Sequence, residues 1–175
     1  MIEIRAAAAT DAAALAELAA ATFGLACPPH TTTEAIAAFL RDVLAEDNFD
    51  VYLADPDRLI LVAEEGGILL GYTMLAFAEP TDADVRAAIG IRPTVELSKC
   101  YLRAETHGRG VAGPLMTATL EAARARGAAG SWLGVNQENA RAIRFYGKNG
   151  FVVVGAKRFL VGERYEDDFV LERAL

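Results

Sequence analysis

The chain has 175 residues, 53% of them hydrophobic, and its 17 basic and 24 acidic side chains give a net charge of −7. This length and this apolar share suit one domain with a substantial core, so we expect a single domain over residues 1–175. The acidic balance argues against a nucleic-acid partner, which selects a basic face. It is compatible with a cationic small molecule, although acidic charge often serves solubility alone.

Composition also argues against membrane, secreted and metal-binding classes. No apolar run reaches the length of a membrane span, because charges such as Asp11 and Glu17 interrupt the alanine-rich stretches. Residues 1–5 lack the basic segment and apolar core of a signal peptide. Cys27 and Cys100 have no histidine at ligand spacing, so we expect neither a disulfide framework nor a metal site. These features indicate a cytoplasmic protein without a membrane partner.

The N-terminal quarter of the chain predicts an edge strand and two helices. Residues 2–5 form the strand, and Thr10 caps a helix from residue 11 to about 21, with Leu15 and Leu18 facing inward. The loop 24–30 contains a Pro-Pro pair, which blocks a continuous helix. A threonine-rich cap opens a second helix that runs to about Ala45. Its apolar residues are expected to be buried: Ile36, Phe39, Leu40 and Val43.

The middle of the chain predicts a hairpin and a long loop. Asp, Pro and Asp at residues 55–57 form a turn. Strands follow at residues 59–64 and 68–78, and the Gly-Gly pair between them is a hairpin signal. Residues 80–93 are a longer loop with one helical turn near residues 84–88.

A glycine-rich turn past mid-chain is the strongest functional signal. An apolar strand at residues 95–102 leads to His107-Gly108-Arg109-Gly110-Val111-Ala112-Gly113, and a helix then continues to about Arg126. The small residues allow positive φ and let another group approach the backbone closely. The first N–H groups of a helix have no partner within it and carry the positive end of its dipole. This turn is therefore a candidate site for a phosphate or pyrophosphate.

Two common phosphate-binding motifs do not match this turn in full. A Walker loop needs a lysine after its last glycine, and none follows Gly113. Gly108, Gly110 and Gly113 have the spacing of a dinucleotide fingerprint, but they lie late in the chain and the next strand, residues 131–135, does not end in an acid. On the glycines alone, a tight turn without a ligand is the alternative.

A second motif begins after that strand. Asn139 is a helix start signal and Gly150 a stop signal, and Ala142, Ile143 and Tyr146 share one helix face with Asn139. Together the two segments resemble the acetyl-CoA signature of the GCN5-related N-acetyltransferase (GNAT) superfamily. The matching residues are His107-x-x-Gly110-x-Ala112 and Asn139-x-x-Ala142-x-x-x-Tyr146-x-x-x-Gly150-Phe151. His107 departs from the family's usual Gln or Arg, which removes one side-chain donor.

The resemblance implies an α/β GNAT fold, with a mixed, mostly antiparallel sheet of about seven strands flanked by helices and closed by strands 151–160 and 168–173. It implies N-acetyltransferase activity with acetyl-CoA as cosubstrate. In the family the strand before the glycine turn splays from its neighbour, and its free backbone pairs with the pantetheine arm. The implied cofactor-binding residues are Cys100, Tyr101, Leu102, His107, Gly108, Arg109, Gly110, Val111, Ala112, Gly113, Asn139 and Tyr146.

Tyr146 is the candidate general acid. The resemblance places it where the family's tyrosine hydroxyl meets the CoA sulfur, and the alternative is a core tyrosine packed with Phe145. An oxyanion hole is implied at a backbone N–H near Leu102. Cys100 has no histidine partner in the sequence, and direct transfer needs no covalent intermediate, so we interpret it as a packing residue.

Glu96 is the candidate base. An alkyl amine with a pKa near ~10.4 is neutral only about once in 2,500 molecules at pH 7, so removal of its proton needs help. On a regular strand Glu96 shares a face with Ser98, Cys100 and Leu102. The family includes enzymes in which a carboxylate at this place draws the amine proton, often through water. The alternative is a structural carboxylate paired with a lysine or an arginine.

A narrower resemblance concerns the acceptor. The runs Trp132-Leu133-Gly134-Val135, Phe145–Phe151 and Asp168-Phe169-Val170-Leu171 are similar to PaiA-type spermidine/spermine N-acetyltransferases. The implied acceptor is a small cationic amine such as a polyamine. The carboxylates that could attract it are Glu163, Glu166, Asp167 and Asp168; a solvated acidic turn is the alternative.

Other functions stay open on the sequence. His30 is a weaker candidate for the acceptor entrance, because a lone loop histidine is usually just exposed. Within the enzyme class, the acceptor could be a peptide N-terminus, an amino acid or an antibiotic amine. Outside it, the fold could serve as a CoA-sensing module without turnover. A homodimer is possible, since relatives are often dimers.

Overall fold

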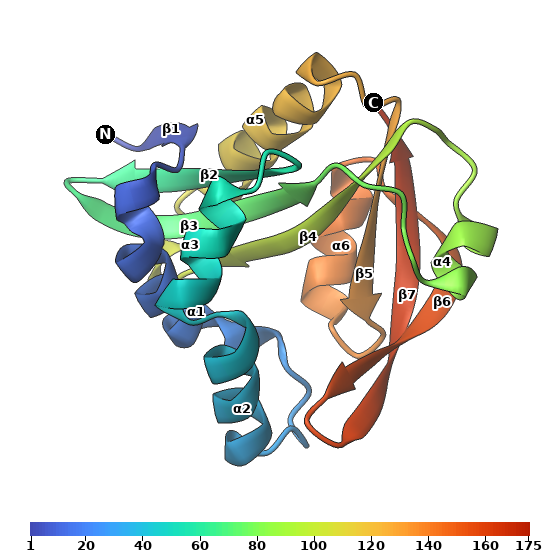
Figure 1. The fold of residues 1–175 in the computed structure, drawn as a ribbon, viewed down its shortest axis with the longest axis horizontal. Helices are drawn as coiled ribbons and strands as arrows, with labels where there is room; N and C mark the ends of the chain where they lie inside the picture. Colours follow the sequence, from blue (N-terminus) through green and yellow to red (C-terminus); the bar gives the residue numbers. More distant parts are fainter.

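A computed structural model describes residues 1–175 and contains one seven-stranded sheet with the order β1-β2-β3-β4-β5-β7-β6 (Figure 1). The strands are β1 (Glu3–Ala6), β2 (Arg58–Glu65), β3 (Ile68–Ala76), β4 (Thr94–Leu102), β5 (Gly130–Asn136), β6 (Val152–Val161) and β7 (Arg164–Ala174). The helices are α1 (Ala12–Ala26), α2 (Thr33–Val43), α3 (Glu46–Ala54), α4 (Ala83–Ala88), α5 (Ala112–Ala125) and α6 (Ala140–Lys148). All neighbouring strands are antiparallel except β4 and β5, which confirms the expected fold class.

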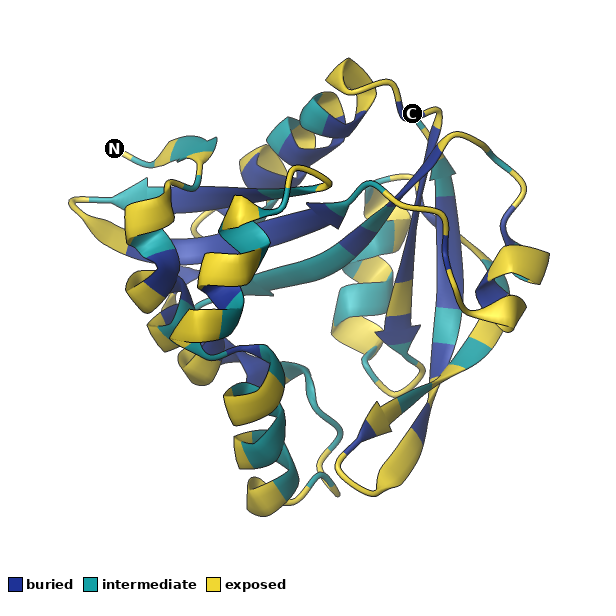
Figure 2. Ribbon diagram, viewed as in Figure 1, coloured by how far each residue is buried: buried dark blue, intermediate teal, exposed yellow.

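Helices cover both faces of the sheet (Figures 1 and 2). On one face α1 and α3 pack on β2 and β3, where Leu15, Leu18 and Phe49 are fully buried. On the other face α5 packs on β2 to β5, and Met116 and Leu120 close the core against the sheet. Burial of apolar area at roughly 25 cal/mol per Å² makes these two layers the main source of stability.

The first helix begins and ends differently from the expectation. A 3₁₀ turn, η1 (Ala9–Asp11), precedes α1, and the Asp11 carboxylate accepts a 2.7 Å hydrogen bond from the Ala8 N–H. Asp11 also pairs with Arg5 at 2.7 Å, which lowers the pKa of the Asp11 carboxyl. Thr10 is therefore not the cap. The helix continues to Ala26 rather than Ala21, because only the Pro-Pro pair stops it.

The segment Ala9–Ala26 is the one helical stretch long and apolar enough to cross a membrane, with a mean hydropathy of 1.2. The expectation that no apolar run is long enough to span a membrane is therefore wrong, as judged by length and hydropathy. In the structure Leu15, Leu18 and Phe23 of this segment are buried in the cluster that joins it to the sheet.

The expected second helix is present as α2, and a further helix, α3, follows it directly. α2 ends at Val43, and Asn48 holds the break, because its side chain accepts from the Ala45 N–H at 3.1 Å and donates to the Asp42 carbonyl at 3.2 Å. α3 then runs to Ala54 and was not predicted. The apolar face of α2 is only half-buried, contrary to the expectation for its four residues: Ile36, Phe39, Leu40 and Val43.

A β-bulge in β4 changes the expected faces of that strand. Leu97 pairs with Leu75 and Lys99 with Met74, so Ser98 is left over between them. Residues opposite each other on antiparallel strands share a face, and Glu96 therefore lies on the face of Lys99.

Tyr101 continues that face, where it packs against Tyr72 at a centroid distance of 5.8 Å. Cys100 and Leu102 lie on the opposite face, toward α5 and α6. The expectation that Glu96 shares a face with Ser98, Cys100 and Leu102 is wrong, because the alternation was counted without the extra residue.

Substitution of Phe49 tests whether α3 contributes to the hydrophobic core. The Phe49 side chain is fully buried and meets the Tyr72 ring edge-on at 5.7 Å. We expect Phe49→Ala to lower the free energy of unfolding by about 3–5 kcal/mol. Val51 lies on the same helix with 66% exposure, so Val51→Ala is the matched control and should change it by less than about 0.5 kcal/mol. Equal effects in urea denaturation would contradict the packing described for α3.

Candidate active site

The site begins where β4 and β5 separate. Their parallel ladder holds only from the Thr94–Gly130 pair to the Glu96–Trp132 pair. Beyond it the two strands diverge (Figure 1), and the edge of β4 that faces β5 has no strand partner from Leu97 onward. Free backbone N–H and C=O groups in a groove are ready to pair with an extended ligand.

The glycine turn closes one end of this groove. Gly108 and Gly110 have φ of 84° and 75°, a conformation that L side chains rarely adopt. A Cβ built at Gly108, Gly110 or Gly113 would meet nothing within 4 Å. The turn therefore faces open space at the start of α5, and a group that approaches it meets backbone rather than side chains.

Most of the predicted cofactor residues line this one groove. It is formed by Cys100, Tyr101, Leu102, His107, Gly108, Gly110, Val111, Ala112, Gly113, Asn139 and Tyr146. Arg109 is the exception, because its guanidinium points away to Glu65 on β2 at 2.7 Å. Arg109 therefore does not line the groove.

The cationic residues of the groove were not predicted from the sequence. Arg141 and Lys148 of α6 line it, together with Thr22, Leu25, Ala26, Thr106, Ala142 and Phe145. Burial and the nearby Arg141 charge lower the pKa of His107, so at pH 7 the groove takes its positive charge from α6. The sequence signal that could have identified Arg141 as a groove residue is its position just after the Asn139 cap.

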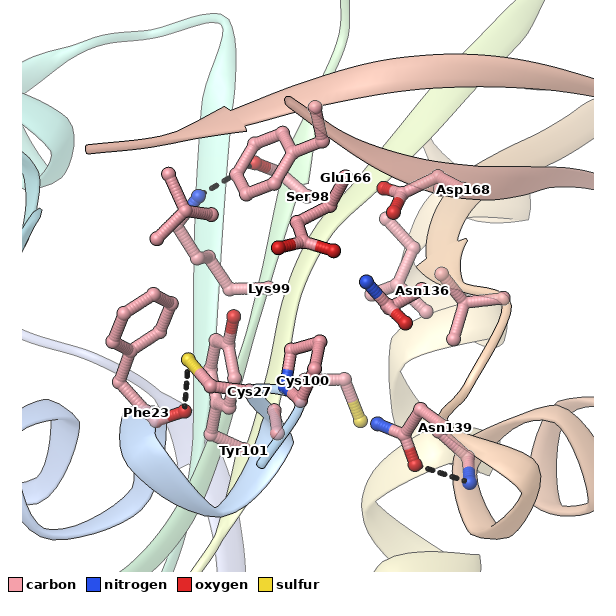
Figure 3. Close-up of a pocket in the computed structure, with 18 of the residues that line it drawn as sticks. Phe23, Cys27, Ser98, Lys99, Cys100, Tyr101, Asn136, Asn139, Glu166 and Asp168 are labelled. Carbon is pink, nitrogen blue, oxygen red and sulfur yellow. Dashed lines mark hydrogen bonds between the residues drawn. The ribbon is translucent and has the colours of Figure 1, made fainter. Parts of the chain in front are cut away.

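A second pocket adjoins the groove (Figure 3). Aromatic side chains from α1, α2 and β6 form part of its wall: Phe23, Phe39 and Phe159. The groove and the pocket share six residues: Ala26, Cys100, Tyr101, Asn139, Ala142 and Tyr146. The two cavities therefore meet beside Tyr146, and a group at the end of the groove can reach a group in the pocket.

Tyr146 is fixed at this junction by α6. The centroid of its ring lies 5.6 Å from that of Phe145 and 6.0 Å from that of Phe151, and Tyr146 and Cys100 line both cavities. The cap of α6 sets its position, because the Asn139 side chain accepts from the Ala142 N–H at 3.1 Å. Burial raises the pKa of Tyr146 well above its ordinary value and that of Cys100 to about 12. Both groups keep their protons at neutral pH, so Cys100 is a poor nucleophile.

Glu96 and Lys99 are neighbours on the pocket face of β4. Burial raises the pKa of Glu96, and the positive charges of Lys99, Lys157 and Arg58 oppose that rise. Burial lowers the pKa of Lys99 to about 8, and the Glu96 charge opposes it. The Lys99 ammonium donates to the Ser98 hydroxyl at 3.2 Å. Both groups are shifted toward their neutral forms, which suits proton transfer near neutral pH.

The acidic residues of β7 divide into two sets. Glu166 and Asp168 are 8% and 5% exposed and line the pocket, whereas Glu163 and Asp167 are exposed. The solvated-turn interpretation therefore holds only for the second set. The division follows from the alternation of side chains along β7, which begins at Arg164 and not at Asp168.

His30 does not line the pocket but contacts Glu166, which does. Its Nε2 is 2.7 Å from Glu166 Oε1, and its Nδ1 is 3.8 Å from the Glu138 carboxylate. The Arg164 guanidinium lies 3.5 Å from the same Glu166 oxygen. His30 thus connects the loop after α1 to β7. No group of three or more His, Cys, Asp or Glu side chains is arranged to hold a metal ion.

The sequence profile of the acetyltransferase (GNAT) family matches residues 15–151. The chain belongs to this family. A curated N-acetyltransferase of Mycobacterium tuberculosis, itself named uncharacterized, is 45% identical over 166 residues, which cover 95% of this chain and 99% of the relative. The GNAT chain is therefore an acetyltransferase, and its cosubstrate is acetyl-CoA.

Solved structures agree on the fold. The PaiA N-acetyltransferase from Thermoplasma acidophilum, in complex with coenzyme A, has a TM-score of 0.80 at 22% identity and covers 100% of this chain and 99% of that one. The Salmonella typhimurium protein yncA, with its cofactor acetyl-CoA, has a TM-score of 0.66 at 22% identity and covers 100% and 94%. At these identities the likeness concerns the GNAT fold alone.

Gly110 tests the role of the turn. Gly110→Val should place a branched side chain in the open space of the groove and weaken CoA binding more than tenfold. Gly127, with φ of 87° and nothing within 4 Å of a built Cβ, lies outside the groove. Gly127→Val therefore introduces similar backbone strain and serves as the control. Unchanged CoA affinity of the Gly110 variant in calorimetry would reject the turn as the phosphate site.

Proposed function

We propose that this protein is an N-acetyltransferase that moves the acetyl group of acetyl-CoA directly to a primary amine, and that the amine is small and cationic, such as a polyamine. The observation that carries this proposal is the junction of groove and pocket at Tyr146 and Cys100. A thioester that lies along the groove would end where an amine in the pocket can attack it, with no covalent enzyme intermediate.

The groove suits CoA along its length. The free edge of β4 at residues 100–102 would pair with the pantetheine arm, and the turn at residues 107–113 would hold the pyrophosphate on backbone N–H groups. Arg141 and Lys148 add positive charge beside it. Asn139 and Tyr146 would lie against the end of the arm. A backbone N–H near Leu102 would stabilise the oxyanion.

In the proposed reaction Glu96 takes the proton that the amine loses, directly or through water. Its raised pKa makes it a stronger base than an exposed carboxylate, and Lys99 beside it limits that rise. Tyr146 gives a proton to the sulfur as the C–S bond breaks. The high pKa of Tyr146 keeps this proton in place until then.

The charge of the pocket supports a cationic acceptor. Three carboxylates line it, Glu96, Glu166 and Asp168, against two amines, Lys99 and Lys157. With a pKa of about 8, Lys99 is partly neutral at slightly alkaline pH. These carboxylates agree with the narrower sequence resemblance to PaiA-type spermidine/spermine N-acetyltransferases.

Thiol release from acetyl-CoA over a panel of polyamines, monoamines, amino acids and peptide N-termini tests this proposal. Activity on amino acids or peptides without activity on polyamines would reject the cationic acceptor and keep the acetyltransferase. Absence of release with every amine would favour a CoA-sensing module.

We propose further that the chain acts as a single domain in the cytoplasm. A homodimer is an option, and analytical sedimentation tests it.

Tyr146→Phe removes the proposed proton donor and keeps the ring packing. Turnover should fall about 10- to 100-fold, less than a full general-acid effect because a thiolate already leaves readily. CoA affinity should change little. Tyr165, 61% exposed on β7, provides the control Tyr165→Phe, which should retain turnover. Wild-type turnover of the Tyr146 variant would make that residue structural.

Glu96→Gln tests the proposed base through the pH profile of the rate. An alkyl amine loses its proton near pH ~10.4 without help, so the defect should be largest near pH 7 and smallest at pH 9–10. Glu79 is an exposed carboxylate outside the pocket, and Glu79→Gln should leave the profile unchanged. A defect of equal size at all pH values would indicate that Glu96 only supports the structure.

A further inference from the structure

One carboxylate oxygen in the pocket has no partner. Asp168 is 5% exposed, and its Oδ1 is buried without a hydrogen-bond partner. Its other oxygen, Oδ2, lies 3.9 Å from the Lys157 ammonium. Figure 3 shows the Asp168 side chain turned into the pocket near Asn136 and Glu166. A buried acceptor without a donor costs stability unless a ligand supplies that donor.

The register of the sheet produces this arrangement. Asp168 on β7 stands between Asn136 on β5 and Lys157 on β6. The Lys157 chain occupies the space beside Gly134, where a Cβ would lie 2.5 Å from the Lys157 Cε. Lys157 also lies 5.1 Å from the Phe159 ring centroid. Lys157 is thus held on the Oδ2 side of the carboxylate.

The neighbouring polar groups leave Oδ1 to a ligand. The Asn136 side-chain Oδ1 accepts from the Glu138 N–H at 2.9 Å, and no donor of Asn136 or of another residue lies within hydrogen-bond distance of Asp168 Oδ1. Glu166 is engaged by His30 at 2.7 Å and adds negative charge beside Asp168. A donor that carries positive charge therefore fits better at Oδ1 than a neutral donor, since it also meets the field of Glu166.

We propose that Asp168 Oδ1 binds a second ammonium group of the acceptor, so that the pocket selects diamines over monoamines of the same length. This inference rests on the proposed amine acceptor and adds its anchor. Glu96 on β4 would serve the reacting amine, while Asp168 on β7 holds the distal one. Burial raises the pKa of Asp168 to about 6, with Lys157 opposing and Glu166 and Asp167 assisting, so the anchor is charged at neutral pH.

The test compares binding of 1,4-diaminobutane and n-butylamine to the CoA-loaded protein by calorimetry at pH 7.5. A hydrogen bond to a charged group contributes roughly 1.5–3 kcal/mol, so the wild type should bind the diamine at least about tenfold more tightly. Asp168→Asn should reduce that ratio to about threefold or less. Asp167→Asn makes the same change of charge at an exposed neighbour and should keep the wild-type ratio.

Each outcome supports or overturns the proposal that Asp168 anchors the second ammonium group. Equal affinity of the wild type for the two amines would overturn it, as would an unchanged ratio in Asp168→Asn or equal losses in both variants. Asp168→Glu keeps the charge but moves it, and a partly restored ratio would support the anchor should the Asn variant fold poorly. Because binding is measured without turnover, failure of thiol release with every amine would reject the proposed reaction separately.

Discussion

The rest of the site depends on the short ladder between β4 and β5. Parallel strands gain stability from each added backbone pair, yet these two stop pairing at Glu96 and Trp132. β5 instead pairs with β7 along its whole length, from Gly130 to Asn136. β5 is thus held along its other edge by β7, while the edge of β4 beyond Glu96 stays free. The same divergence brings α6, which follows β5, to the side of the groove where Tyr146 meets Cys100.

The pocket places charge where an apolar core would be more stable. Glu96, Lys99 and Asp168 lie among aromatic walls, including Phe39 and Phe159 at a centroid distance of 5.9 Å. Burial moves the pKa of all three toward the neutral form. Buried groups with shifted pKa values lower stability and are typical of functional sites. Pocket chemistry, and not packing, is therefore the better explanation for these residues.

The sequence predicted the features that local chemistry determines. The positive φ of Gly110 and the cap at Asn139 depend on a few neighbouring residues, so the turn and α6 were predicted, together with the side of α6 that lines the groove. α3 was missed because tertiary burial of Phe49 holds that short helix. The Ser98 bulge and the partner of Arg109 were missed because each depends on a distant strand, β3 or β2. The two inward-facing carboxylates of β7 could have been predicted from the sequence, since strand alternation alone places Asp168 and Asp167 on opposite faces.

The bulge at Ser98 has a consequence for the reaction. On a regular strand Glu96 would face the side of Cys100 and Leu102, opposite Lys99 and Tyr101. The extra residue moves the proposed base onto the pocket face and leaves Cys100 and Leu102 on the other face. One strand can then serve the acceptor with one face and the thioester with its free edge. Bulges often re-aim a side chain beside an active site, and here the bulge gives Glu96 and Lys99 a common environment in which each moderates the pKa of the other.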